Sequence, residues 1–370
     1  TFFRNNLFTL CHLIYTDTFY MKRKWIRWVS WILLTPIILF VILMVLLYVP
    51  PVQNLLRREV TAYASKATGM QIQVERIDLR FPLNLLVRGV EVIQQPDTLL
   101  SLESLNVRVQ AWPLIKGKVE VDEVTLSRVA VNSADLMEGM KIKGVLGRFF
   151  LQSHGVDLSN ELAVINQVEL SDTHMQLLMN DTTTTPKDTT ASAPINWKVA
   201  LHQLKLKNVS FSMQLPADSM RMTAHIGEAA INNAQADLKN QYYDLKKFLL
   251  SGTSASYDTG TAQPTEGFDA SHIAVRDIRI ALDSLLYKGR DMNAVIREFT
   301  MNERSGLSVT ALTGRAYSND SVISVPSLKL NTPHSEIDLS AHTYWELVNI
   351  PTTGRLSARL NAYIGKEDVM

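Results

Sequence analysis

The sequence predicts a mostly β fold, in which an N-terminal transmembrane helix is followed by an elongated, curved antiparallel β-sheet trough with few short helices. Two observations support this fold class. One apolar spacing recurs along most of the chain, and a long uncharged segment lies near its start.

The recurring spacing is Φ-x-Φ-x-x-Φ-x-Φ, in which Φ is an apolar residue, and its clearest copy runs from 119 to 131. Alternation with period two indicates a strand with one apolar face. The two consecutive polar positions in the middle of the motif, which we call the double polar step, would move the following apolar residues to the other face of the strand. A β-bulge or tight turn at each step would bring them back to the first face. We therefore expect a continuous apolar face lined by Val119, Val121, Val124, Leu126, Val129, Val131, Val168, Leu170, Val199, Leu201, Leu204, Leu206, Val209, Phe211, Ile278 and Ile280.

The uncharged segment runs from Trp28 to Val49, which as a helix would span about 33 Å, enough to cross a bilayer core. A cleaved signal peptide would have a shorter apolar core and small residues at its cleavage site. Basic residues 22–24 and Arg27 precede the segment, so the positive-inside rule places the N-terminus in the cytoplasm. The predicted membrane anchor includes Trp28, Trp31, Pro36, Phe40 and Tyr48.

The remaining elements follow from periodicity and turn residues. Residues 50–69 predict a connecting helix that ends at Gly69, and residues 70–180 predict the first part of the β-groove. Within it, 133–152 suit a short helix or an inserted loop. Thr-rich residues 181–194 predict a flexible linker or loop. The groove continues over 195–370; there, 234–250 favour a helix over a strand pair, and 251–270 favour a polar loop.

The two ends of the sequence also carry expectations. The chain begins with Thr1, and Met21 is followed by basic residues, so we expect 1–20 to be an upstream extension and 21–49 to form the basic start and anchor. The last residues follow another alternating stretch, so we expect the groove to be truncated there.

Composition argues against several function classes. The formal net charge is +1, five of the basic residues lie within 1–49, and no basic stripe follows, which argues against nucleic-acid binding. Cys11 is the single cysteine, and the eight histidines lack metal-ligand spacing. His154 and His174 are expected to be solvated or hydrogen-bonded. No catalytic motif is found, so we predict no catalytic residue, no metal and no cofactor.

Residues 21–131 resemble the AsmA-like superfamily, and within it the TamB group of diderm bacteria. The resemblance rests on the basic start and anchor, the join Val49-Pro50-Pro51-Val52 into a helix ending at Gly69, and the strands at 74–79, 86–92 and 119–127. It implies an inner-membrane anchor, a periplasmic body, a bridge-like β-groove and a role in moving phospholipids to the outer membrane. It also implies a possible Omp85-class outer-membrane barrel partner.

Four functions remain open from the sequence. The first is a lipid conduit, in which acyl chains lie on the apolar face of the trough. The second is a structural or chaperone-like module of outer-membrane protein assembly, whose sheet edge would receive strands by β-augmentation. An anchored β-sandwich, with apolar faces covering each other, is the third. An anchored enzyme is the fourth, and the missing motifs argue against it.

Overall fold

The computed structural model describes Thr35, Ile38, Val41, Ile42 and Val45 together with residues 48–81, 83–94, 97–110, 112–113, 120–133, 139–157, 160–179, 196–349 and 354–368. The chain divides into two units, residues 1–59 and 60–370. Trp28, Trp31, Pro36 and Phe40 of the predicted anchor lie outside the described residues, whereas Tyr48 lies in a turn just ahead of the helix that begins at Pro50. Within the described part of the chain, no helix has the length and apolar character needed to cross a membrane.

The connecting helix predicted from the sequence is confirmed as α2, Pro50–Thr68. Proline suits the first position of a helix, because the backbone N–H that proline lacks would have no partner within the helix there. Gly69 follows with φ of 70°, and its amide donates to the carbonyl of Ser65 at 3.0 Å. A left-handed glycine is a common helix end. The Ser65 hydroxyl then accepts from the amide of Ile72 at 3.0 Å, at the start of the first strand.

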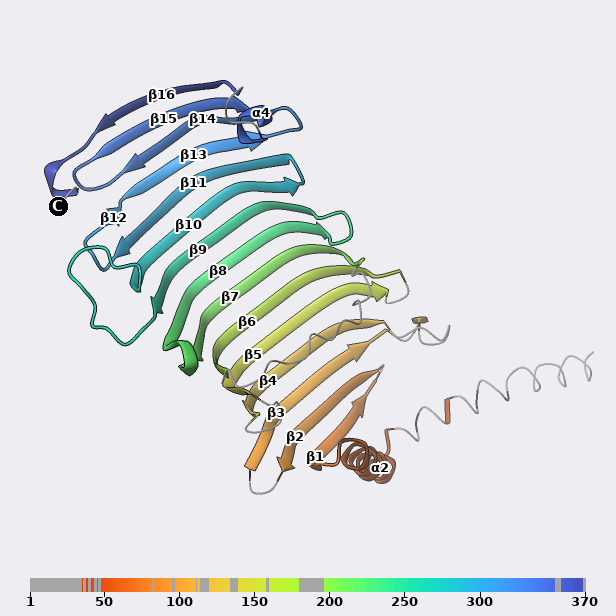
Figure 1. Ribbon diagram of the computed structural model, residues 1–370. Coiled ribbons are helices and arrows are strands. Elements are labelled where there is room, and N and C mark those ends of the chain that lie inside the picture. Colours follow the sequence, from red (N-terminus) through yellow and green to blue (C-terminus); the bar gives the residue numbers. More distant parts are fainter. Residues whose placement is uncertain are drawn as a thin grey trace, which may run out of the picture. The chain divides into compact units, whose positions relative to one another are not determined.

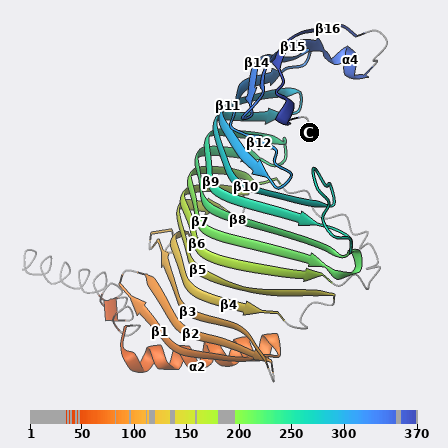
Figure 2. The same ribbon diagram turned by 90° about the vertical axis from the view of Figure 1, so that its left-hand side faces the viewer.

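Most described residues after α2 belong to one curved β-sheet (Figures 1 and 2). Its strands are β1 (Gln71–Arg80), β2 (Asn84–Gln94), β3 (Asp97–Val109), β4 (Val121–Asn132), β5 (Met140–Asp157), β6 (Leu162–Met179), β7 (Lys198–Leu215), β8 (Met220–Asp237), β9 (Tyr242–Asp258), β10 (His272–Lys288), β11 (Asp291–Glu303), β12 (Ser308–Val309), β13 (Ala311–Ser318), β14 (Val322–Asn331), β15 (Glu336–Tyr344) and β16 (Leu356–Tyr363). The described helical pieces after α2 include η1 (Pro216–Asp218), α4 (Trp345–Asn349) and η2 (Lys366–Asp368).

The strands lie in chain order from β1 to β16, with the short β12 paired to β11 off the main path. Growth in one direction, as the sequence indicated, is therefore confirmed, and the described strands form no second sheet. The antiparallel prediction is wrong for one pair, because β6 and β7 run parallel, with Leu162 opposite Lys198 and Leu178 opposite Gln214. A parallel neighbour needs a long connection between strands, and the chain between Met179 and Lys198 is long enough to supply one.

Three local predictions are also corrected. Residues 140–152 belong to β5, where a short helix or loop was expected. Residues 234–250, expected to be helical, form the end of β8, a turn and the start of β9. Residues 251–258, expected in a polar loop, complete β9. In the second case Leu245 and Phe248 are three apart because a double polar step separates them, and that spacing imitates a helical period.

A crease runs across the sheet where the double polar steps fall side by side. We call these positions the crease row; from β1 to β10 it comprises Glu75, Gly89, Glu103, Arg128, Gly147, Asp172, Asn208, Gly227, Gly252 and Asp277. Over β1–β7 the pairing register is the same on both sides of the row. In β2 and β3, for example, Arg88 pairs with Ser104 before the row and Val90 pairs with Leu102 after it. Arg128, Asp172 and Asn208 have φ of 47°, 51° and 52°. These left-handed residues are the irregularity that the double step predicted.

Neighbouring strands approach closely along the crease row. A Cβ added to Gly147 would lie 2.7 Å from the carbonyl oxygen of Asp172, and one added to Gly227 would lie 2.8 Å from that of Gly252. Side chains in the row also bond to each other. The Asn208 amide donates to Asp172 at 2.8 Å, and Arg128 pairs with Glu103. Arg128 and Glu103 are well exposed, so their pairing contributes little energy but orders the crease.

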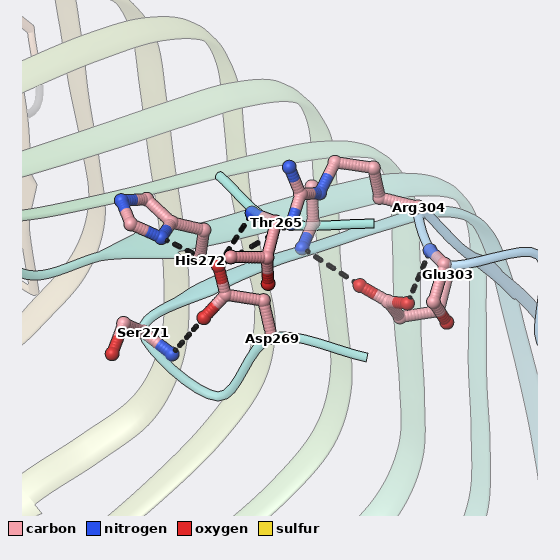
Figure 3. A network of polar contacts seen from close by, with 8 residues as sticks. Thr265, Asp269, Ser271, His272, Glu303 and Arg304 are labelled. Carbon is pink, nitrogen blue, oxygen red and sulfur yellow. Dashed lines mark hydrogen bonds and ion pairs between the residues drawn. The ribbon is translucent and has the colours of Figure 1, made fainter. Parts of the chain in front are cut away.

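A polar knot links the β9–β10 connection to the end of β11, where a guanidinium nitrogen of Arg304 lies 4.0 Å from the Asp269 carboxylate (Figure 3). Asp269 accepts from the amides of Thr265 at 3.1 Å and Ser271 at 2.9 Å, and from the His272 ring at 2.9 Å. Glu303 accepts from the amide of Ser305 at 2.6 Å and that of Ala274 at 3.3 Å. The Thr265 amide, with the His272 ring and the Ser271 amide, holds the pKa of the Asp269 carboxyl well below its usual range.

Replacing Gly147 by alanine should destabilise the sheet by about 1–3 kcal/mol, because the added methyl meets backbone atoms of β6 that cannot turn aside. Urea unfolding followed by circular dichroism measures the loss. The control is Ser127→Ala, a half-buried position beside the crease, which should change stability by less than about 0.5 kcal/mol. Equal stabilities for the two variants would contradict the close approach at the crease.

Asp269→Asn should loosen the 259–271 connection at neutral pH, because the amide carries no charge to strengthen the bonds that Asp269 accepts. Since the folded pKa lies below the ordinary aspartate value of about 3.9, the carboxylate stabilises the knot above that pH, and this contribution disappears as the pH falls through the folded pKa. Amide exchange at Thr265 and Ser271 should be several-fold faster in the variant at pH 7 and converge with the wild type only in strong acid. Unchanged exchange at pH 7 would refute the role of the charge.

Candidate functional site

The candidate site is one face of the sheet, built from apolar rows that cross the strands. The longest row takes one residue from each strand between β1 and β16 on the main path: Leu79, Leu85, Val107, Val124, Leu151, Val168, Leu204, Ile231, Phe248, Leu282, Ile296, Gly314, Leu328, Leu339 and Leu360. We call it the long row. Directly paired residues share a face of a sheet, so these side chains form one apolar band.

A second row, the middle row, reaches from β1 to β11. It lies two residues away from the long row along β1 to β10 and three residues away along β11. It contains Ile77, Val87, Leu105, Leu126, Phe149, Leu170, Leu206, Ala229, Leu250, Ile280 and Phe299. Alternation places it on the same face as the long row. Both rows lie to one side of the crease.

Beyond the crease, further apolar residues continue the face. Val129 pairs with Leu102 and Leu146, and Val209 pairs with Thr173 and Ile226. Val131 and Phe211 belong to the next row out. The left-handed residue of β4, Arg128, allows Leu126 and Val129 to share a face although they are three residues apart.

The sequence-predicted residues are distributed over these rows as follows. Val124, Val168 and Leu204 lie in the long row; Leu126, Leu170, Leu206 and Ile280 lie in the middle row; and Val129, Val131, Val209 and Phe211 lie beyond the crease. Val121 pairs with Val109, Val199 with Ala163, Leu201 with Ile165, and Ile278 with Thr253. Val119 lies outside the described residues.

The apolar face is not covered by any described element. Every member of the long row is at least partly accessible, and Leu360 is 62% exposed. Buried apolar residues in the described chain are limited to Ile77, Leu99, Leu102, Ala163, Ala229, Ala281 and Val309, and no large side chain there is fully buried. A β-sandwich would bury the side chains between its sheets, so the described strands do not have the sandwich architecture.

The other face of the same strands is polar. One residue along from the middle row, Thr125, Phe150, Glu169 and Lys205 share a cross-strand row in which Phe150 is the apolar member. The Lys205 ammonium lies 3.6 Å from the Glu169 carboxylate. In the next polar row, Arg108 lies 3.3 Å from Glu123. The two faces therefore differ in chemistry although both are open to solvent.

The polar groups weighed in the sequence analysis form no reactive cluster. His154 Nδ1 lies 2.5 Å from the side-chain oxygen of Asn166, beside a cavity of about 700 Å³ that also contacts His202 and Glu120. None of these residues belongs to the apolar rows. Among the described residues, no group of three or more histidine, cysteine or acidic side chains could hold a metal ion.

The apolar face determines what this site can bind. It can bind apolar surface over a long path, and its rows contain no charged residue between β1 and β10. Sequence periodicity indicated separate copies of the motif, but only the register reveals that they align into rows. Neither the family models nor the curated protein sequences compared with this chain give a match.

Proposed function

We propose that this chain is an anchored lipid-transfer protein whose apolar sheet face carries phospholipid acyl chains between the inner and outer membranes of a diderm cell envelope. The long row is the observation that supports this proposal most strongly. An acyl chain placed on this row would contact Val, Leu, Ile or Phe on nearly every strand, with one glycine among them.

The energetics suit such a cargo. Each methylene removed from water contributes about 0.8 kcal/mol, so two acyl chains can be held without a specific headgroup site. A cargo that is bound by uniform apolar rows meets no single deep minimum, and it can move from strand to strand. Charged residues on the opposite face keep that side of the sheet in water.

Figure 2 shows that the sheet is strongly curved. The proposal places the apolar face on the inside of this curve as a trough, with headgroups at its open edge. The proposal places the anchor at 28–49 in the inner membrane and the β-sheet in the periplasm, because the basic residues of 1–49 precede the uncharged segment. An Omp85-class barrel in the outer membrane is the proposed receiving partner. The chain's role in this proposal is not enzymatic and uses no cofactor.

A photo-crosslinking residue at Leu126 or Leu204 should capture phospholipid in cells, because both positions lie on the apolar rows. The matched controls are Thr125 and Lys205, which are their chain neighbours and share one row of the opposite face. These should give at least about tenfold less lipid adduct, since an acyl chain gains nothing from a polar face. Mass spectrometry of the purified adducts provides the measurement.

Equal lipid capture from both faces, or none from either, would overturn the lipid proposal. Adducts with outer-membrane proteins in place of phospholipid would instead support strand addition at the sheet edge.

A reporter enzyme that is active only after export, fused following Ala130, should be active in intact cells. The expectation rests on four basic residues at 22–27, ahead of the uncharged segment. Reversing the charge bias, by changing these four residues to glutamate and adding lysines after residue 58, should lower the activity. An unaltered fusion that is expressed but inactive would contradict both the compartment and the lipid route.

A further inference from the structure

One end of the apolar face differs in chemistry from the rest, because it is rich in methionine. Met140, Met175, Met179, Met213, Met220 and Met222 come from four neighbouring strands, β5 to β8. We call them the methionine patch. They are six of the 13 methionines in the sequence. At the opposite end of the same strands, the apolar positions are Ile165, Leu201 and Ala234, with no methionine among them.

The register joins these residues into one surface. Met140 pairs with Met179, and Met213 pairs with Met222. Met175 pairs with Phe211, and Met220 pairs with Leu215. Strand alternation places the patch on the same face as Val209, one of the predicted lining residues.

The patch is accessible to small molecules. Met179 is 38% exposed and Met222 is 39% exposed, and the other four methionines are half-buried. Phe211, which lies among them, is 43% exposed. A thioether in contact with solvent can be oxidised, whereas a leucine or isoleucine in the same place cannot.

From this placement we infer that the methionine patch makes acyl-chain binding sensitive to peroxide-class oxidants; the inference rests on the proposed lipid function. Hydrogen peroxide transfers one oxygen atom to a methionine sulfur, so an S–O bond forms and the O–O bond breaks. The sulfur loses two electrons and the peroxide is reduced to water. The product is a sulfoxide, a strong hydrogen-bond acceptor in place of an apolar thioether.

Clustering is what makes the effect large. A single sulfoxide on a broad apolar face could be avoided by the cargo. Six neighbouring sulfoxides would turn one end of the face over β5 to β8 polar, and an acyl chain there would have to desolvate them without supplying hydrogen-bond donors. Oxidation would therefore interrupt the path of the cargo at this end of the strands, while the long row, which has no methionine, stays apolar.

The experiment measures binding of a fluorescent phosphatidylethanolamine to the full chain in detergent micelles, before and after treatment with hydrogen peroxide. The untreated protein should bind. Treatment should lower the amount of lipid bound at saturation, because the patch no longer takes acyl chains while the long row still does, and peptide mass spectrometry should confirm sulfoxide at the patch. In a variant with all six patch methionines changed to leucine, binding should survive treatment, since leucine conserves volume and apolar character.

The matched control changes Met70, Met292 and Met301 to leucine and leaves the patch intact, so oxidation should lower its lipid binding as much as that of the wild type. Bound lipid should also slow oxidation of the patch relative to Met70. Two outcomes would overturn the oxidation inference while the lipid proposal stands. In the first, the untreated protein binds and the oxidised wild type binds equally well. In the second, the untreated protein binds and the six-leucine variant is as sensitive to oxidation as the wild type. If the untreated protein and the six-leucine variant both fail to bind, both are overturned.

Discussion

Every strand of the long central region must keep its apolar residues on one face while the strand bends, and the rest of the structure depends on how this constraint is met. If a strand of 18 residues, the length of β6, were fully regular, it would keep strict alternation and resist a sharp bend. In β6 a double polar step breaks the alternation twice, at Asn166-Gln167 and again at Ser171-Asp172 in the crease row. Because the steps of neighbouring strands coincide there, the irregularities form one line across the sheet, and the ladder of paired residues continues on both sides of it.

The same constraint explains which residues occupy the crease. A left-handed backbone costs little for glycine and is tolerated by asparagine and aspartate, whose side chains can bond locally. Gly89, Asp172, Asn208 and Asp277 fit this rule. Arg128 does not fit it by residue type, and its pairing with Glu103 of the adjacent strand is the compensating interaction. Where the crease residue has an ordinary φ, as at Gly147 and Gly227, the glycine is needed for close approach instead.

Much of the fold could be predicted from the sequence, and the failures have physical causes. The strands at 119–131 and 199–211 were evident because their apolar spacing is clean. The hairpin at 234–250 was missed because a double step at Lys246-Lys247 gives the same three-residue spacing as a helix. The parallel pair could not be predicted, since apolar periodicity does not encode strand direction. For the candidate site, periodicity identified residues of the apolar rows but not the residues they pair with. The methionine patch appears only when β5 to β8 are placed side by side, and the knot at Asp269 needs 259–271 to meet β11.

A sheet of this kind has little core, so its stability has to come from ladders between neighbours. Each strand contacts mainly the strands on either side of it, as in repeat proteins, in which stability is a sum of nearest-neighbour terms. Such an architecture can leave its apolar face uncovered without losing its shape. The single glycine of the long row supports this view. A Cβ at Gly314 would lie 2.6 Å from the carbonyl oxygen of Ser327, so close backbone approach accounts for the missing side chain there. The one interruption in the long row thus preserves strand pairing and adds no polar group to the row, as the proposed acyl-chain path requires.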